Sequence, residues 1–237
     1  MVDYGLNVKN SNQEVQIDSQ YRNLSLDSSG SGVSIDNSTG GTFQAAEISI
    51  DSSALVPLIV WQPSTSYFSI IFAYNKSGDN YISFYATTED AQTDSINWKC
   101  YRENRAASGD TYGLLVYNSG GNLIFDSGKK YLKIRQISSA SLSNPSAWSY
   151  PSSDVSHTSY SDPYYVLSPN CGFWYLSAQI NPSQWRFQYL KIGLKKLNST
   201  SVRVGWFPTV NAITGANIGN VSEGFNPSGL KLIICEE

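Results

Sequence analysis

A segment near the start of the chain recurs near its middle, and this repeat constrains the fold more than any other feature of the sequence. Residues 4–26 read YGLNVKNSNQEVQIDSQYRNLSL, and residues 112–134 read YGLLVYNSGGNLIFDSGKKYLKI. The two segments align without a gap at an offset of 108, and 9 of the 23 positions are identical. A repeat of this kind predicts two copies of one structural unit in the chain.

The residue pattern within each copy predicts a β-meander. In the first copy, apolar and polar residues alternate over 6–8 and again over 15–17, as in strands that bury one face. The polar segment 10–13 between them is typical of a turn. The aspartate that ends the return strand, Asp126 in the second copy, is expected to accept a backbone N–H in an Asx-turn. A third strand is expected to begin near Leu24.

The two copies differ on one face of the hairpin. The first copy carries polar residues between its core positions, whereas the second carries Leu115, Tyr117 and Ile124. A strand that is apolar on both faces is usually covered on both sides. We therefore expect the second hairpin to be sandwiched by the first half or by a neighbouring subunit, and we take these three residues as candidate interface residues. Sequence drift on a solvated face is the alternative.

The rest of the chain is also rich in strand-forming residues separated by Gly, Pro, Asn and Ser. The expected strands are Glu47–Ile50, Tyr67–Tyr74, Tyr81–Tyr85, Ile96–Tyr101, Trp174–Ile180, Trp185–Leu194, Val202–Phe207 and Leu230–Cys235. The apolar parity switches within 185–194, which predicts a β-bulge near Tyr189 and Leu190. The sequence thus predicts an all-β protein with two tandem antiparallel β-sandwich or barrel domains related by internal duplication, residues 1–110 and 111–237.

Two segments read as loops. Residues 27–41 are rich in Ser and Gly, and residues 138–170 form a long stretch rich in Ser, Tyr and Pro. Long loops within compact domains are often functional. Aromatic rings on the second loop could stack on sugars, or they could fill a core or an interface. The candidate glycan-contact residues are Trp148, Tyr150, Tyr164 and Tyr165.

Composition disfavours several classes of partner and of site. Charged residues make up 15% of the chain and its net charge is −3, so no electrostatic footprint for nucleic acid is expected. No apolar run is long enough for a membrane span, and the opening residues lack the charged and apolar regions of a secretory signal, so synthesis in a cytoplasm is expected. The three cysteines, Cys100, Cys171 and Cys235, are expected to be free thiols.

Catalytic patterns are weak. A Ser-His-Asp arrangement would depend on His157, the single histidine, which we interpret as a packed or exposed loop residue. The chain has no phosphate-binding glycine loop and no Ca²⁺ loop, and no context singles out two carboxylates for glycoside hydrolysis. We expect no catalytic, cofactor or metal site.

The repeated element resembles a short hairpin of tailed-bacteriophage structural proteins, roughly Gly-Leu-x-Val-x-Asn-x-x-Gly-x-x-x-Phe-Asp-Ser. The second copy matches it over residues 113–127, including Gly121 and Phe125. The first copy departs from it, with Gln13 in place of the glycine and Ile17 in place of the aromatic. The resemblance covers 23 residues in each half and implies a virion component without catalytic residues.

The expected function is therefore that of a non-enzymatic virion protein of a tailed phage, made in the host cytoplasm. It would be a tail-tip, baseplate or fibre-associated component that forms a homo-oligomer and contacts other tail proteins. The alternatives are a module that binds a host-surface glycan, a head decoration protein, and an enzyme such as a depolymerase.

Overall fold

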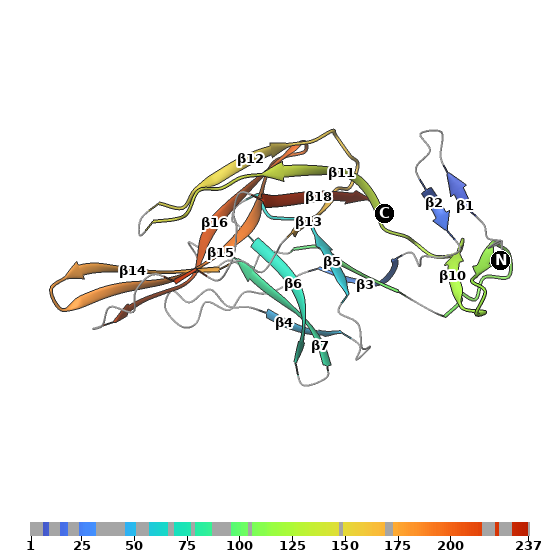
Figure 1. Ribbon diagram of the computed structural model, residues 1–237, viewed down its shortest axis with the longest axis horizontal. Helices are drawn as coiled ribbons and strands as arrows, with labels where there is room; N and C mark the ends of the chain where they lie inside the picture. The colour runs from blue at the N-terminus through green and yellow to red at the C-terminus, as the bar shows by residue number, and fades with distance from the viewer. Residues whose placement is uncertain are drawn as a thin grey trace.

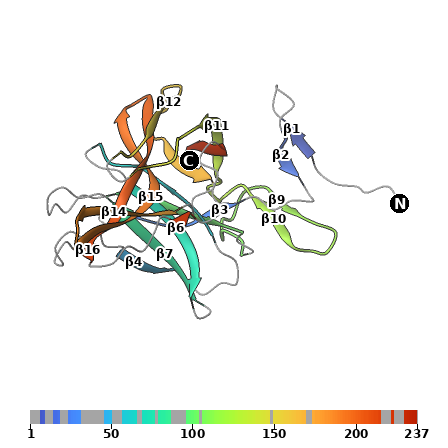
Figure 2. The same ribbon diagram turned by 60° about the vertical axis from the view of Figure 1, so that its left-hand side comes forward.

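The computed structural model describes residues 7–9, 15–18, 24–31, 46–50, 57–65, 69–76, 79–86, 96–103, 106–146, 149–168, 173–214, 221–222 and 229–236. The regular elements in these ranges are β-strands that pair antiparallel in several sheets, and no α-helix occurs among them. The all-β class expected from the sequence is confirmed. Two large sheets form the body of the molecule, and two short hairpins lie toward one end (Figures 1 and 2).

A six-stranded sheet has the order β11-β18-β13-β5-β8-β3. Its strands, in that order, are Lys133–Ala140, Leu230–Glu236, Tyr164–Ser168, Leu58–Trp61, Trp98–Arg102 and Ser25–Gly30. The strands β3 and β11 lie at its two edges. Both follow a copy of the repeat, as the expected third strand of each meander does.

An eight-stranded sheet follows the order β12-β16-β15-β6-β7-β4, with β14 and β17 attached through β15. The strands on this path are Ser152–Ser156, Ser201–Thr214, Gln184–Asn198, Ser69–Lys76, Asp79–Ala86 and Ala46–Ile50. The attached strands are Phe173–Asn181 and Val221–Ser222. The register of β15 against β16 shifts between Tyr189 and Leu190, which confirms the bulge expected from the change in apolar parity.

Each half of the chain contributes its strands in the same order. In the six-stranded sheet, β8 lies between β3 and β5, and β18 lies between β11 and β13. In the eight-stranded sheet, β7 lies between β4 and β6, and β16 lies between β12 and β15. The halves join where Trp61 of β5 pairs with Tyr165 of β13, and where Ser69 of β6 pairs with Leu194 of β15.

The sheets therefore continue across the boundary expected near residue 110. One buried apolar cluster takes large side chains from both halves, among them Trp61, Ile96, Trp98, Leu190, Trp206 and Leu232. Burial of such side chains dominates the free energy of folding. Residues 1–110 and 111–237 thus share their sheets and this core, whereas the sequence had suggested two separate units.

The six-stranded sheet also carries a second apolar cluster. Along its strands, the side chains of this second cluster alternate with those of the first cluster. Along β5, Ile59 and Trp61 belong to the first cluster, and Val60 belongs to the second. Leu24 and Leu132, which are equivalent positions of the repeat, both pack against the second cluster. Both faces of this sheet therefore bury apolar side chains.

All eight strands expected outside the repeat are present, with ends that differ by up to seven residues. The expected loop 138–170 is wrong in part, because it contains the end of β11 and the whole of β12 and β13. The strand β12 lies at a sheet edge and buries only Val155. Its sequence is therefore mostly polar, which is why no strand was expected there. The segment 27–41 likewise begins with the last residues of β3.

Candidate interaction surface

The sequence repeat is also a structural repeat. In the first hairpin, β1 (Asn7–Lys9) pairs with β2 (Val15–Asp18), and Val8 lies opposite Ile17. In the second, β9 (Leu115–Tyr117) pairs with β10 (Leu123–Asp126), and Val116 lies opposite Phe125. These pairs and the bulge beside each are equivalent at the offset of 108. The expected hairpins are confirmed in both copies.

Asp126 holds the base of the second hairpin. Its carboxylate accepts hydrogen bonds from the Ser108 N–H (2.6 Å), the Ser108 hydroxyl (3.1 Å) and the Gly128 N–H (2.9 Å). The bond from Gly128, two residues further on, is the expected Asx-turn. Burial alone would raise the pKa of Asp126, but these hydrogen bonds outweigh it and lower the pKa below its usual value of 3.8. The carboxylate is therefore ionised at neutral pH.

Gly113 and Ser127, both repeated in the sequence, lie close together at the base of the second hairpin. The Leu114 N–H donates to the Ser127 hydroxyl oxygen (2.8 Å), and the Ser127 N–H donates to the Leu114 carbonyl (3.0 Å). Gly113 has a φ of +153°, and a Cβ atom there would lie 2.5 Å from the Ser127 Oγ. A glycine opposite this serine lets the two chain segments approach closely.

Asn118 organises the hairpin turn. Its side-chain oxygen accepts from the N–H groups of Gly120 (3.0 Å) and Asn122 (2.9 Å). Gly121 supplies a φ of +73°, which other residues rarely adopt. The turn expected at 118–121 is therefore confirmed, with a role for its asparagine and its second glycine.

Tyr131 ties this hairpin to the strand that follows. Its hydroxyl accepts the Asp126 N–H (2.6 Å), and its ring stacks on Phe125 with centroids 5.0 Å apart. Burial raises the pKa of the Tyr131 phenol, which stays protonated. The hairpin base, Tyr131 and the start of β11 are thus linked by specific contacts.

The three candidate interface residues have different environments. Ile124 is 4% exposed, so it is buried within the chain and is not available to a partner. Leu115 and Tyr117 are 43% and 51% exposed on one face of β9, while Val116 on the other face is buried. The second hairpin is therefore covered along β10 and open along one face of β9.

Two further large apolar side chains are exposed on the edge strand β11. Ile134 and Ile137 are 55% and 60% exposed. They pair with Cys235 and Ile233, which belong to or pack against the second apolar cluster. Neither isoleucine was among the candidates expected from the sequence. The change from Ser29 in the first copy to Ile137 at the equivalent position of the second is the signal that could have pointed to Ile137.

The candidate glycan-contact residues do not gather on an exposed loop. Tyr164 and Tyr165 lie in the central strand β13 and are 7% and 1% exposed, so the expectation of stacking platforms there is wrong. Tyr150 is half-buried and packs against the main core. Trp148 lies outside the described residues.

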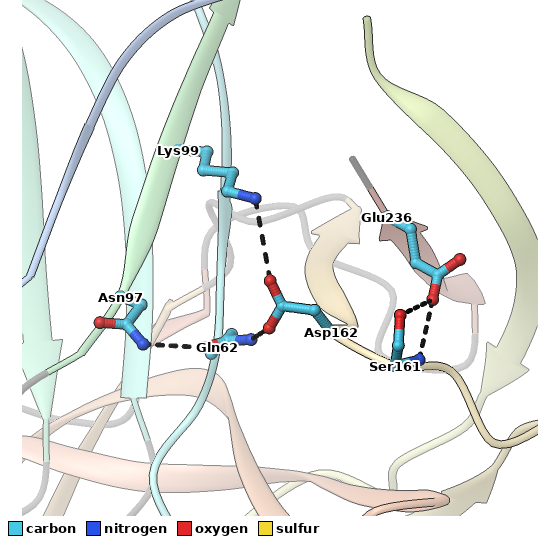
Figure 3. Close-up of polar contacts among 6 residues, drawn as sticks. All are labelled: Gln62, Asn97, Lys99, Ser161, Asp162 and Glu236. Atoms are coloured by element: carbon cyan, nitrogen blue, oxygen red, sulfur yellow. Dashed lines mark hydrogen bonds and ion pairs between the residues drawn. The ribbon is translucent and has the colours of Figure 1, made fainter. Parts of the chain in front are cut away.

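A polar cluster joins the two halves at one end of β13 (Figure 3). Asp162 accepts a hydrogen bond from Gln62 and lies 3.9 Å from the Lys99 ammonium. The Asn97 amide donates to Gln62 (2.8 Å), and the Lys99 ammonium lies 4.1 Å from the centroid of the Tyr164 ring. The side chain of Lys99 is buried, so these partners compensate a charge that would otherwise be costly.

Glu236 makes a second tie to the same segment (Figure 3). It accepts from the N–H (3.0 Å) and the hydroxyl (3.3 Å) of Ser161 and from the Arg135 guanidinium (2.9 Å). Burial raises the pKa of Glu236, but these partners outweigh burial and hold the pKa below its usual value. The carboxylates of Asp162 and Glu236 thus both accept hydrogen bonds from donors within the chain.

His157 is a packed residue. Its Nδ1 lies 2.7 Å from the Thr158 carbonyl, and its Nε2 lies 2.8 Å from the Tyr165 hydroxyl. A catalytic triad would place a carboxylate and a serine hydroxyl at these two positions. Both ring nitrogens therefore have a partner within the chain.

Two of the three thiols are described, and both are free and buried. Burial raises the pKa of Cys100, and it raises the pKa of Cys235 to about 12. Cys171 lies outside the described residues. Across the part of the chain that the structure describes, no group of three or more His, Cys, Asp or Glu could hold a metal ion. In that same part, no helix is long and apolar enough to cross a membrane.

Among the described residues, the feature best suited to contact another molecule is the set of exposed apolar side chains on β9 and β11. Comparison with protein-family models, curated proteins and solved structures gives no match for this chain.

Proposed function

We propose that this chain is a non-enzymatic structural protein of a tailed-phage virion, a tail-tip, baseplate or fibre-associated component made in the host cytoplasm. It acts by assembling with itself and with other tail proteins. Its mechanism is geometric: a rigid body of two sheets presents apolar side chains and strand edges to its neighbours.

The observation that carries this proposal is the exposure of Leu115 and Tyr117 on a hairpin whose base is held by Asp126 and Ser127. Neighbouring large apolar side chains exposed on an ordered element are typical of an interface, because a partner removes them from water. The resemblance of this hairpin to an element of phage tail proteins supports the same proposal.

The proposal includes an internal duplication of the whole chain. Each half would be a six-stranded antiparallel sandwich, β3–β8 in the first half and its counterparts in the second. The common strand order in both halves and the common register of both hairpins support this. The strands β14 and β17 would be additions to the second half.

The test is the location of the protein in the particles of the phage that encodes it. Gold-labelled antibodies against the chain are applied to purified particles and viewed by electron microscopy. We expect label at the tail. Label on the head would favour the head decoration alternative, and particles without the protein by both labelling and mass spectrometry would overturn a virion role.

A further inference from the structure

We propose that this protein associates head to tail with a second copy of itself, and that residues 112–137 of one copy dock on the acidic first half of the next. This inference rests on the self-assembly part of the proposed function and names the surface and its partner. It follows from the placement of apolar side chains, from the charge of the segment and from the charges of the two halves.

The apolar part of the surface comes from one stretch of chain. Between residues 112 and 137, six large apolar side chains are at least 43% exposed. They are Tyr112, Leu114, Leu115, Tyr117, Ile134 and Ile137. Tyr112 and Leu114 are identical to their counterparts in the first copy, yet they are 92% and 47% exposed, so packing within the chain does not explain their recurrence.

The same stretch is basic. Residues 129–135 read KKYLKIR, with four cations and no acidic residue. Lys130, Lys133 and Arg135 are exposed, and Arg135 already pairs with Glu236 of the same chain. At the equivalent positions of copy one, Ser25 replaces Lys133 and Asp27 replaces Arg135. The second copy therefore differs from the first by being both more apolar and more positive.

The two halves of the chain have opposite charge. Residues 1–110 contain 13 acidic and 6 basic side chains, whereas residues 111–237 contain 6 acidic and 10 basic ones. A two-fold contact through the basic stretch would bring like charges together, which is unfavourable. A contact between the second half of one copy and the first half of the next brings opposite charges together, so it is the favoured arrangement.

Contacts between the halves already occur within one chain. The segment 129–132 of the second copy runs beside residues 24–26 of the first: the Leu26 N–H donates to the Lys130 carbonyl (2.7 Å), and the Leu132 N–H donates to the Leu24 carbonyl (3.1 Å). The exposed side chains Leu115 and Tyr117 of β9 and Ile134 and Ile137 of β11 lie in the chain segments before and after this junction. A second copy would extend the same kind of contact outward.

A head-to-tail contact uses two different surfaces, so it generates either a closed ring or an open filament. Charge attraction of this kind depends on salt, because the screening length falls from about 14 Å at 0.05 M to about 4 Å at 0.5 M. Association should therefore weaken as the salt concentration rises.

The test measures the mass of the purified full chain by light scattering, over a range of protein concentrations at low and at high salt. The test variant is Lys130→Glu with Lys133→Glu. The matched control is Lys195→Glu with Lys196→Glu, which makes the same charge change on β15. Circular dichroism confirms that each variant is folded.

We expect the wild-type protein to associate at low salt and to dissociate at high salt. The test variant should raise the dissociation constant roughly 100-fold, and the control should change it less than about 3-fold. A wild-type monomer under all conditions would overturn the inference, yet label on phage tails would still support the proposed function. Association that both variants leave intact, or that salt strengthens, would overturn the assigned surface while leaving self-assembly in place.

Discussion

Replacing Asp126 with alanine removes the group that closes the second hairpin. The carboxylate accepts three hydrogen bonds, and the residue is 1% exposed. A hydrogen bond to a charged group contributes about 1.5–3 kcal/mol. Ser108 and Gly128 are exposed, so water can partly replace the lost acceptor after the substitution.

We therefore expect the hairpin to lose about 3 kcal/mol of local stability, which is less than the sum of three such bonds. The strands β9 and β10 form a separate two-stranded sheet, so no further described strand holds them by backbone pairing. A loss of this size should speed amide hydrogen exchange in residues 115–126 roughly 100-fold. Exchange in β13 and β18, in the middle of the six-stranded sheet, should stay the same.

The assay is hydrogen exchange followed by mass spectrometry, with Asp154→Ala as control. Asp154 pairs with Arg203, and the side chains of this pair are 47% and 40% exposed, so its loss should change stability by less than about 1 kcal/mol. Unchanged exchange in 115–126 would refute the role given to Asp126. A uniform increase throughout the protein would refute the local nature of the effect.

Acid should reproduce the effect of this substitution in the wild-type chain. The pKa of Asp126 is lower in the folded protein than its usual value of 3.8. The stabilisation is therefore complete above pH ~4 and is lost as the pH falls through the folded pKa. Exchange in 115–126, corrected for its intrinsic pH dependence, should rise below pH 4 and stay level between pH 5 and pH 8.

Three further predictions follow from other contacts. Gly113→Ala should destabilise the hairpin by about 1–3 kcal/mol, because the new Cβ would lie 2.5 Å from the Ser127 Oγ and the backbone φ is +153°. The same exchange assay measures this, and exchange like that of the wild type would contradict it. Tyr165→Phe should lower the melting temperature by about 2–8 °C in calorimetry, because it leaves Nε2 of the buried His157 without its partner; an unchanged melting temperature would show that the bond contributes nothing. The thiol of Cys235, whose pKa burial raises to about 12, should resist alkylation at pH 8 until the protein is unfolded, and rapid labelling of the native protein would show that the thiol is accessible.

Local sequence patterns predicted much of the fold. The alternation of apolar residues predicted the hairpins and many of the other strands. The change of apolar parity in 185–194 predicted the bulge at Tyr189 and Leu190. These features depend on which face each side chain occupies, and that alternation is visible in the sequence. The turn residues Asn118 and Asp126 act as their chemistry suggests.

The pairing of strands from the two halves could not be read from the sequence. The strands β5 and β13 meet through Trp61 and Tyr165, and backbone hydrogen bonds between strands carry no sequence code for the partner. The repeat therefore indicated two similar units but not that their sheets would join. The strand β13 was missed because its apolar run lies within a Ser- and Pro-rich stretch.

The candidate surface was found only in part. Leu115 and Ile124 look equivalent in the sequence because each lies on a strand that is apolar on both faces. Only the three-dimensional arrangement places Ile124 inside and leaves Leu115 outside. Ile134 and Ile137 add to the surface because β11 is the last strand of its sheet, which depends on the strand order.

The most direct measurement for the central claim asks whether the exposed face of β9 is covered in the assembled particle. A photo-reactive phenylalanine analogue is placed at Tyr117, which is 51% exposed, and phage particles that carry it are purified and irradiated. The proposed function predicts covalent adducts to a second copy of this chain or to another tail protein, identified by mass spectrometry. Particles that contain the labelled chain but give no adduct at Tyr117 would contradict an assembly role for this surface.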